Sequence, residues 1–147
     1  MTKVAVVYHS YKGVSEKLVR ALVEGIVEGG GEARCKSAGE ASIDDLLASD
    51  VFVLASGQPF GVIAGPMKAF LEACWLAPER QQLQGKPFAF IINGSNDPKE
   101  SGTYLEKLAG YFQWPVAAPG ILTKAEAADQ VADEARQLGV SLAGRRG

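Results

Sequence analysis

Val4-Ala5-Val6-Val7-Tyr8 leads through His9 into Ser10-Tyr11-Lys12-Gly13-Val14-Ser15, so an apolar segment is followed by a loop with one glycine and two serines. The same arrangement occurs twice more, because the apolar segments 51–55 and 88–92 lead into the glycine-bearing loops 57–65 and 93–97. Unbroken apolar runs of this length are typical of strands that are covered on both faces of a sheet. Ligands of open parallel sheets bind at the carboxyl ends of the strands, so the three loops predict one shared ligand site.

The composition is that of a single globular domain spanning residues 1–147. Apolar residues make up 47% and charged residues 22% of the chain, and the net charge of −2 provides no basic footprint for nucleic acid. No apolar run approaches the ~20 residues that a membrane span needs. Cys35 and Cys74 form no CxxC pair, and Met1-Thr2-Lys3 enters a strand without the apolar region of a signal peptide. We therefore expect reduced thiols, no membrane partner and a cytoplasmic location.

Helical and extended patterns alternate along the chain, which predicts βαβ units and a parallel sheet. Strands are expected at residues 3–8, 32–37, 51–55, 87–92 and 115–119. Helices are expected between them, up to residue 28 and at 42–48, 65–75 and 102–112, and a last helix begins at the capping box Thr123-Lys124-Ala125-Glu126.

The composition of the strands predicts their order in the sheet. Segment 32–37 alternates charged residues with small ones, and segment 115–119 contains two prolines, so both belong at sheet edges. The three apolar segments belong in the centre. The resulting order is 2-1-3-4-5, in which the direction of strand addition reverses between the first and third strands. The loops after these two strands should therefore border the ligand site.

The loop after the first strand has the residues that a phosphate site requires. Ser10 and Ser15 can donate hydroxyl hydrogens, Lys12 can add positive charge, and backbone N–H groups at a helix start bind anions. A structural interpretation is equally open at this point, in which Ser15 caps the helix and Gly13 turns the chain. The loop after the third strand carries Phe60 between several glycines, and its exposed backbone N–H groups suit the polar edge of a flat ring.

Other proteins with this strand order are excluded by single positions. A phosphoacceptor receiver needs an acidic pair after the first strand and an aspartate after the third, where this chain has Tyr8-His9-Ser10 and Ala55-Ser56. A low-molecular-weight tyrosine phosphatase needs a cysteine and an arginine in the first loop, which contains neither. Neither a GxxxxGK[ST] loop nor a GxGxxG loop is present.

The remaining pattern is that of a known superfamily. Segment 10–15 resembles the phosphate loop of the flavodoxin-like superfamily, which has the pattern hydroxyl-x-x-Gly-x-hydroxyl. Phe60-Gly61-Val62-Ile63-Ala64-Gly65-Pro66-Met67-Lys68-Ala69-Phe70-Leu71 is similar to the segment after the third strand in NAD(P)H-dependent FMN reductases and in quinone reductases of the tryptophan-repressor-binding-protein type. The resemblance covers nearly the whole chain and implies a flavodoxin-like, three-layer α/β sandwich with non-covalently bound FMN.

The resemblance also assigns residues to the cofactor. The FMN phosphate is expected on the first loop, at Ser10, Tyr11, Lys12, Gly13, Val14 and Ser15. The ring is expected against the second and third loops, at Gln58, Pro59, Phe60, Gly61, Val62, Gly94, Ser95, Asn96 and Asp97. Asp97 could either tune the ring by its charge or act as a solvated turn residue. No side chain is expected to serve as a catalytic acid or base, and no metal is expected.

Three functions remain open. The chain could be a small reductase that passes electrons from NAD(P)H to a quinone or a similar acceptor. Reductases of this superfamily often complete their site across a subunit interface, so a homo-oligomer is possible. It could instead be an electron carrier between redox proteins, or an interaction module without a cofactor. Carriers of this superfamily usually have a net charge far more negative than −2. They also hold the ring between two aromatic residues, whereas Phe60 is the only aromatic residue in the loops after the third and fourth strands of this chain. The sequence therefore favours the reductase.

Overall fold

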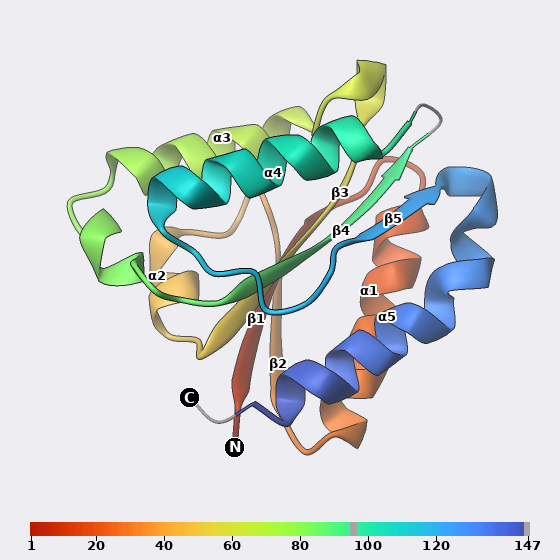
Figure 1. Ribbon diagram of the computed structural model, residues 1–147, viewed down its shortest axis with the longest axis horizontal. Helices are drawn as coiled ribbons and strands as arrows, with labels where there is room; N and C mark the ends of the chain where they lie inside the picture. The colour runs from red at the N-terminus through yellow and green to blue at the C-terminus, as the bar shows by residue number, and fades with distance from the viewer. Residues whose placement is uncertain (95–96, 146–147) are drawn as a thin grey trace.

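A computed structural model describes residues 1–94 and 97–145. Its five strands form one parallel sheet in the order β2-β1-β3-β4-β5, as the sequence predicts (Figure 1). The strands are β1 (Lys3–His9), β2 (Glu32–Ser37), β3 (Val51–Gly57), β4 (Phe88–Gly94) and β5 (Ile121–Lys124). The helices are α1 (Val14–Glu28), α2 (Ile43–Leu47), α3 (Gly65–Leu76), α4 (Lys99–Phe112) and α5 (Ala128–Ala143).

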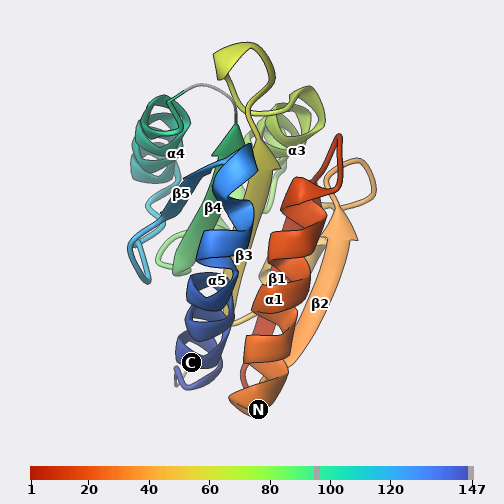
Figure 2. The same cartoon turned by 90° about the vertical axis from the view of Figure 1, so that its right-hand side faces the viewer.

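Helices cover the sheet on both faces. Helices α1 and α5 lie side by side on one face, and α3 and α4 lie on the other (Figure 2). The two faces carry separate apolar cores. Val4 and Val6 of β1 face α1 and α5, whereas Ala5 and Val7 face the side of α3 and α4. Burial on both faces explains why the central strands are apolar at every position rather than at every second one.

The fifth strand is where the sequence-based prediction was wrong. Residues 115–119 do not form a strand, and within this segment only an isolated bridge joins Val116 to Phe88. The strand is β5, which pairs with β4 from Ile91 and Ile121 onward. The predicted capping box was also wrong, because Thr123 is a buried strand residue whose hydroxyl donates to the Lys124 carbonyl. A single 3₁₀ turn over 125–127 then leads into α5.

Helices α1 and α5 pack with their backbones in close approach. A Cβ atom on Gly25 of α1 would overlap the carbonyl oxygen of Arg136 in α5, and a Cβ on Gly139 would overlap that of Leu22. Glycine at these two positions therefore allows a separation that no other residue permits. This packing fixes α1 against the sheet, and with it the loop at the start of α1.

Two helix starts show how local contacts set element boundaries. The backbone N–H of Ser42 donates to the Asp45 carboxylate at 2.8 Å, which confirms the predicted start of α2. Helix α4 begins at Lys99, three residues before the predicted start, because the Asp97 carboxylate accepts the Lys99 N–H at 3.0 Å.

None of the helices in the described residues has the length and apolar character needed to cross a bilayer.

Candidate functional site

The loop between β1 and α1 ends in a left-handed glycine. Gly13 is the N-cap residue of α1 with φ of 83°, a conformation that glycine adopts without strain. Ser15 makes no side-chain capping bond, so the interpretation of Ser15 as a helix cap was wrong. The first N–H groups of α1 have no partner within the helix and are available to an anion.

The hydroxyl of Ser15 instead accepts a hydrogen bond from a residue of the sheet. Asn93, at the end of β4, donates from Nδ2 to Ser15 Oγ at 2.7 Å, and both side chains are buried. Ser10 Oγ and His9 Nε2 are buried atoms without a hydrogen-bond partner in the described part of the chain. Buried polar atoms are nearly always paired, so a water molecule or a polar group of a ligand is needed to satisfy these two atoms.

A cavity of about 410 Å³ opens at the carboxyl ends of β1, β3 and β4, and we call it the strand-end pocket. Its volume lies within the range of small-molecule sites. The first loop, the end of β3 and the end of β4 all contribute to its wall, together with the residue after β5. The lining residues are Ser10, Tyr11, Lys12, Val14, Ser15, Gly57, Gln58, Pro59, Asn93, Gly94 and Ala125. The predicted meeting of the three loops is therefore present.

The five remaining described residues of the predicted set, Gly13, Phe60, Gly61, Val62 and Asp97, lie outside this wall. Gly13 faces a neighbouring hollow of about 240 Å³ toward the start of α5. Gly61 and Val62 line a different hollow, between the β3–α3 loop and α4. Phe60 is fully exposed at the tip of that loop, with φ of 57° and ψ of 25°. A bulky residue in the left-handed region is uncommon, and such strain often accompanies function.

The third predicted loop is only partly described. Ser95 and Asn96 lie outside the described residues. Gly94 ends β4 at the pocket, where a Cβ atom would overlap Gln58 Cγ. Asp97 is exposed, and its carboxylate serves the start of α4 as a turn residue does.

Comparison of the fold with solved structures identifies its class. The chain is similar to a flavodoxin from the domain Archaea at a TM-score of 0.82 and 20% identity, with 96% of each chain covered. The chain is also similar to a WrbA-like flavodoxin from Agrobacterium tumefaciens, at a TM-score of 0.80 and 22% identity. That match covers 97% of this chain and 96% of the other. The two-electron reduced flavodoxin of Megasphaera elsdenii matches at a TM-score of 0.82 and 18% identity, and the match covers 97% of this chain and 99% of the other. The chain has the flavodoxin-like fold. No protein-family model and no curated protein matches the sequence.

Gln58 links two of the loops of this flavodoxin-like fold. Its side chain is buried, donates from Nε2 to the Asp97 carbonyl at 3.1 Å, and accepts the Ser101 hydroxyl at Oε1 at 2.6 Å. The β3–α3 loop is thereby tied to the segment that leads into α4. Gln58 was expected to contact the cofactor, and its side chain is the structural connection between the two loops.

Replacing Gln58 with leucine should lower the free energy of unfolding by about 1–3 kcal/mol, because the buried Ser101 hydroxyl loses its acceptor. Urea unfolding measures this change. The double variant Q58L/S101A should lose less than the sum of the two single variants, since neither partner then remains unsatisfied. Additive losses would show that the two side chains are not coupled.

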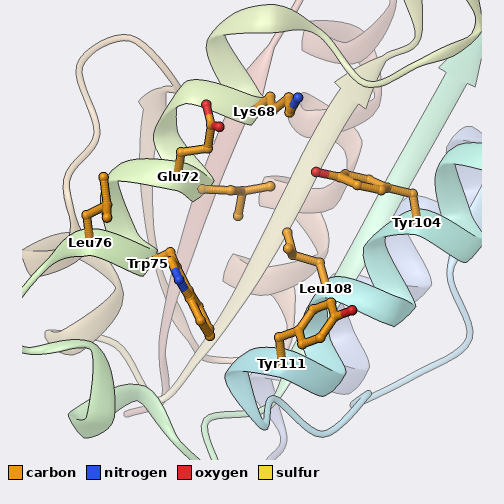
Figure 3. Close-up of a pocket in the computed structure, with 8 residues that line it drawn as sticks. Lys68, Glu72, Trp75, Leu76, Tyr104, Leu108 and Tyr111 are labelled. Atoms are coloured by element: carbon orange, nitrogen blue, oxygen red, sulfur yellow. The ribbon is translucent and has the colours of Figure 1, made fainter.

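A larger apolar groove lies away from the strand ends. It has a volume of about 440 Å³ and runs between α3 and α4, whose side chains face one another across it (Figure 3). Trp75 and Tyr111 meet edge-to-face at its lower end, and Lys68 and Tyr104 lie at the other. In the flavodoxin-like fold the reversal of strand order places the ligand at the strand ends. The strand-end pocket is therefore the candidate functional site, although the groove is slightly larger.

The two lysines around the first loop differ in their ion pairing. Lys17 is paired with Asp129 at the start of α5. Lys12 is exposed and makes no ion pair with the described residues. Lys12 is therefore available to attract an anion to the strand-end pocket.

The two cysteines lie outside the pocket wall and are both free. Desolvation raises the pKa of both thiols, that of Cys74 to about 12, but Cys35 is exposed on the edge strand and Cys74 is buried. The thiolate is the reactive form, so an aromatic disulfide reagent near pH 8 should modify Cys35 in the native protein and spare Cys74. Cys35→Ser should abolish the reaction until the protein is unfolded. Equal modification of both thiols before unfolding would contradict the buried position of Cys74.

Gly57, Asn93 and Ala125 line the strand-end pocket but were not among the predicted site residues. Gly57 stands at the start of the second predicted loop. Asn93 had one usable signal, because it is a polar residue at the end of an otherwise apolar central strand. Ala125 had none, because the prediction placed the fifth strand elsewhere and so assigned the following residues to a helix start.

Proposed function

We propose that this protein binds FMN non-covalently in the strand-end pocket and acts as a small NAD(P)H-dependent oxidoreductase on a quinone or a similar acceptor. The observation that carries the proposal is the convergence of the Ser15 hydroxyl, the orphaned Ser10 hydroxyl and the free N–H groups of α1 beside one pocket wall. Hydroxyl and N–H donors at a helix start are the groups that a phosphate needs.

The residues present fit the two ends of FMN. The first loop supplies uncharged donors and the unpaired Lys12 for the phosphate. The ends of β3 and β4 supply backbone and apolar surface for the ring, at Gly57, Pro59 and Gly94. When bound, FMN supplies the hydride or single-electron chemistry, while the protein holds the ring and limits the access of water.

Two features favour a reductase over a carrier. Phe60 does not line the strand-end pocket, and Tyr11 is the aromatic residue among its described lining. A ring bound there would meet no pair of flanking aromatics from the second and third loops, and its outer face would be open to a substrate. The net charge of −2 also provides little field for steering basic redox partners.

An electron carrier is the second candidate. Several solved flavodoxins match this chain over nearly the full length of both molecules. The exposed Phe60 at the rim could contact a partner protein there.

The addition of NADH or NADPH to the FMN-loaded protein under anaerobic conditions separates the two functions. A reductase should lose its visible flavin absorbance with NAD(P)H alone, and a quinone should restore it. A protein that keeps its colour with both nicotinamides, and is reduced only by dithionite, would be a carrier. A protein that retains no FMN would be neither, and an interaction module would then be the better account.

A further inference from the structure

We propose that Asn93 is the positioning residue that makes the site select phosphorylated flavin, because it orients the Ser15 hydroxyl toward the phosphate. The inference rests on the proposed function, since it assumes that the strand-end pocket takes FMN. It assigns the discrimination between FMN and riboflavin to a contact between two elements that are 78 residues apart in sequence.

The hydrogen bond between the two residues fixes the direction of the hydroxyl. A serine hydroxyl has one hydrogen to donate and two lone pairs to accept with. Asn93 Nδ2 occupies a lone pair of Ser15 Oγ at 2.7 Å. The O–H hydrogen of Ser15 has no acceptor among the described residues and is left for a ligand. Ser15 and Asn93 both line the strand-end pocket, so the hydrogen is available where a phosphate oxygen would bind.

The position of Asn93 is held by the sheet. Its backbone pairs with Gly57 of β3 on one side and with Thr123 of β5 on the other. The side chain is 5% exposed, and Ser15 is 2% exposed. A donor on a central strand between two neighbours has little freedom, so it holds the Ser15 hydroxyl in one orientation before the ligand arrives. Such preorganisation strengthens the contact with a charged group.

Ser10 provides an internal comparison. Its hydroxyl lies in the same pocket and has no partner within the described chain, so nothing orients it. Both serines can donate to a phosphate, and only Ser15 depends on Asn93. The effect of removing Asn93 should therefore vanish when Ser15 is absent, and it should persist when Ser10 is absent.

The test compares the affinities of the FMN-free protein for FMN and riboflavin by fluorescence titration. Asn93→Leu should weaken FMN binding by about 10- to 100-fold, which is the range for a hydrogen bond to a charged group. Riboflavin binding should change by less than about threefold, because riboflavin lacks the phosphate. In the S15A background, N93L should cause no further loss of FMN affinity, whereas the losses in S10A and N93L should multiply.

Two further variants keep the test decisive. Asn93→Ala removes the same donor with a smaller side chain and should reproduce the pattern if N93L does not fold. Ser49→Ala removes another buried serine hydroxyl, whose bond to the Leu46 carbonyl lies away from the pocket, and should leave the FMN-to-riboflavin ratio unchanged.

The outcomes separate the inference from the function on which it rests. An equal loss of both flavins in N93L, or losses in N93L and S15A that multiply, would overturn the positioning role while FMN binding stands. A wild-type protein that binds neither flavin would instead reject the proposed function, before any variant is compared.

Discussion

Replacing Gly13 with aspartate should weaken FMN binding by about two orders of magnitude. A carboxylate at this N-cap position would stand beside the phosphate, and two like charges about 5 Å apart repel by roughly 3 kcal/mol at a surface dielectric. A Cβ atom at Gly13 has open space around it, so the change introduces no steric overlap. Riboflavin affinity should be almost unchanged, because the uncharged ligand has no phosphate to repel. Titration with both flavins measures the effect.

Gly13→Asn is the matched control for this experiment. Asparagine has nearly the same shape as aspartate, tolerates positive φ and carries no charge. Any cost of placing a side chain at φ of 83° is therefore shared by the two variants. FMN binding that is equally weak in both variants would trace the loss to backbone strain. FMN binding untouched by the aspartate would show that the phosphate does not sit on this loop.

Gly25→Ala should lower the free energy of unfolding by about 2–3 kcal/mol. The new methyl group would overlap the Arg136 carbonyl oxygen, so α1 and α5 must move apart or distort, and overpacking of this kind typically costs 1–3 kcal/mol. Gly110→Ala is the control, since a Cβ there has open space within a helix. That variant should gain up to about 1 kcal/mol from helix propensity. Urea unfolding of the two variants should therefore give shifts of opposite sign, and matching shifts would contradict the close packing of α1 on α5.

The central part of the fold could be predicted from sequence because burial leaves a direct signature there. β1, β3 and β4 are apolar at successive positions, and a strand of this kind has no alternative place outside the centre of a sheet. β5 has only four residues, of which two are buried, so its signal was weaker than the nearby capping pattern. Pairing with β4 decided the strand position, and that long-range interaction is not visible in the local sequence.

The candidate site also has a part that could be predicted from sequence and a part that could not. The first loop could be predicted because its glycine, its serines and the following helix are consecutive in the chain. The bonds from Asn93 to Ser15 and from Ser101 to Gln58 join residues far apart in sequence. Their geometry depends on how the strands and helices pack, so a sequence pattern could suggest the residue types but not the contacts.

The most direct test of FMN binding is the visible absorbance of the purified protein, recorded before and after incubation with FMN and passage through a gel-filtration column. We expect a flavin spectrum that travels with the protein peak, and its loss in Gly13→Asp. A wild-type protein that leaves the column colourless after incubation with FMN would contradict the assignment of the strand-end pocket to this cofactor.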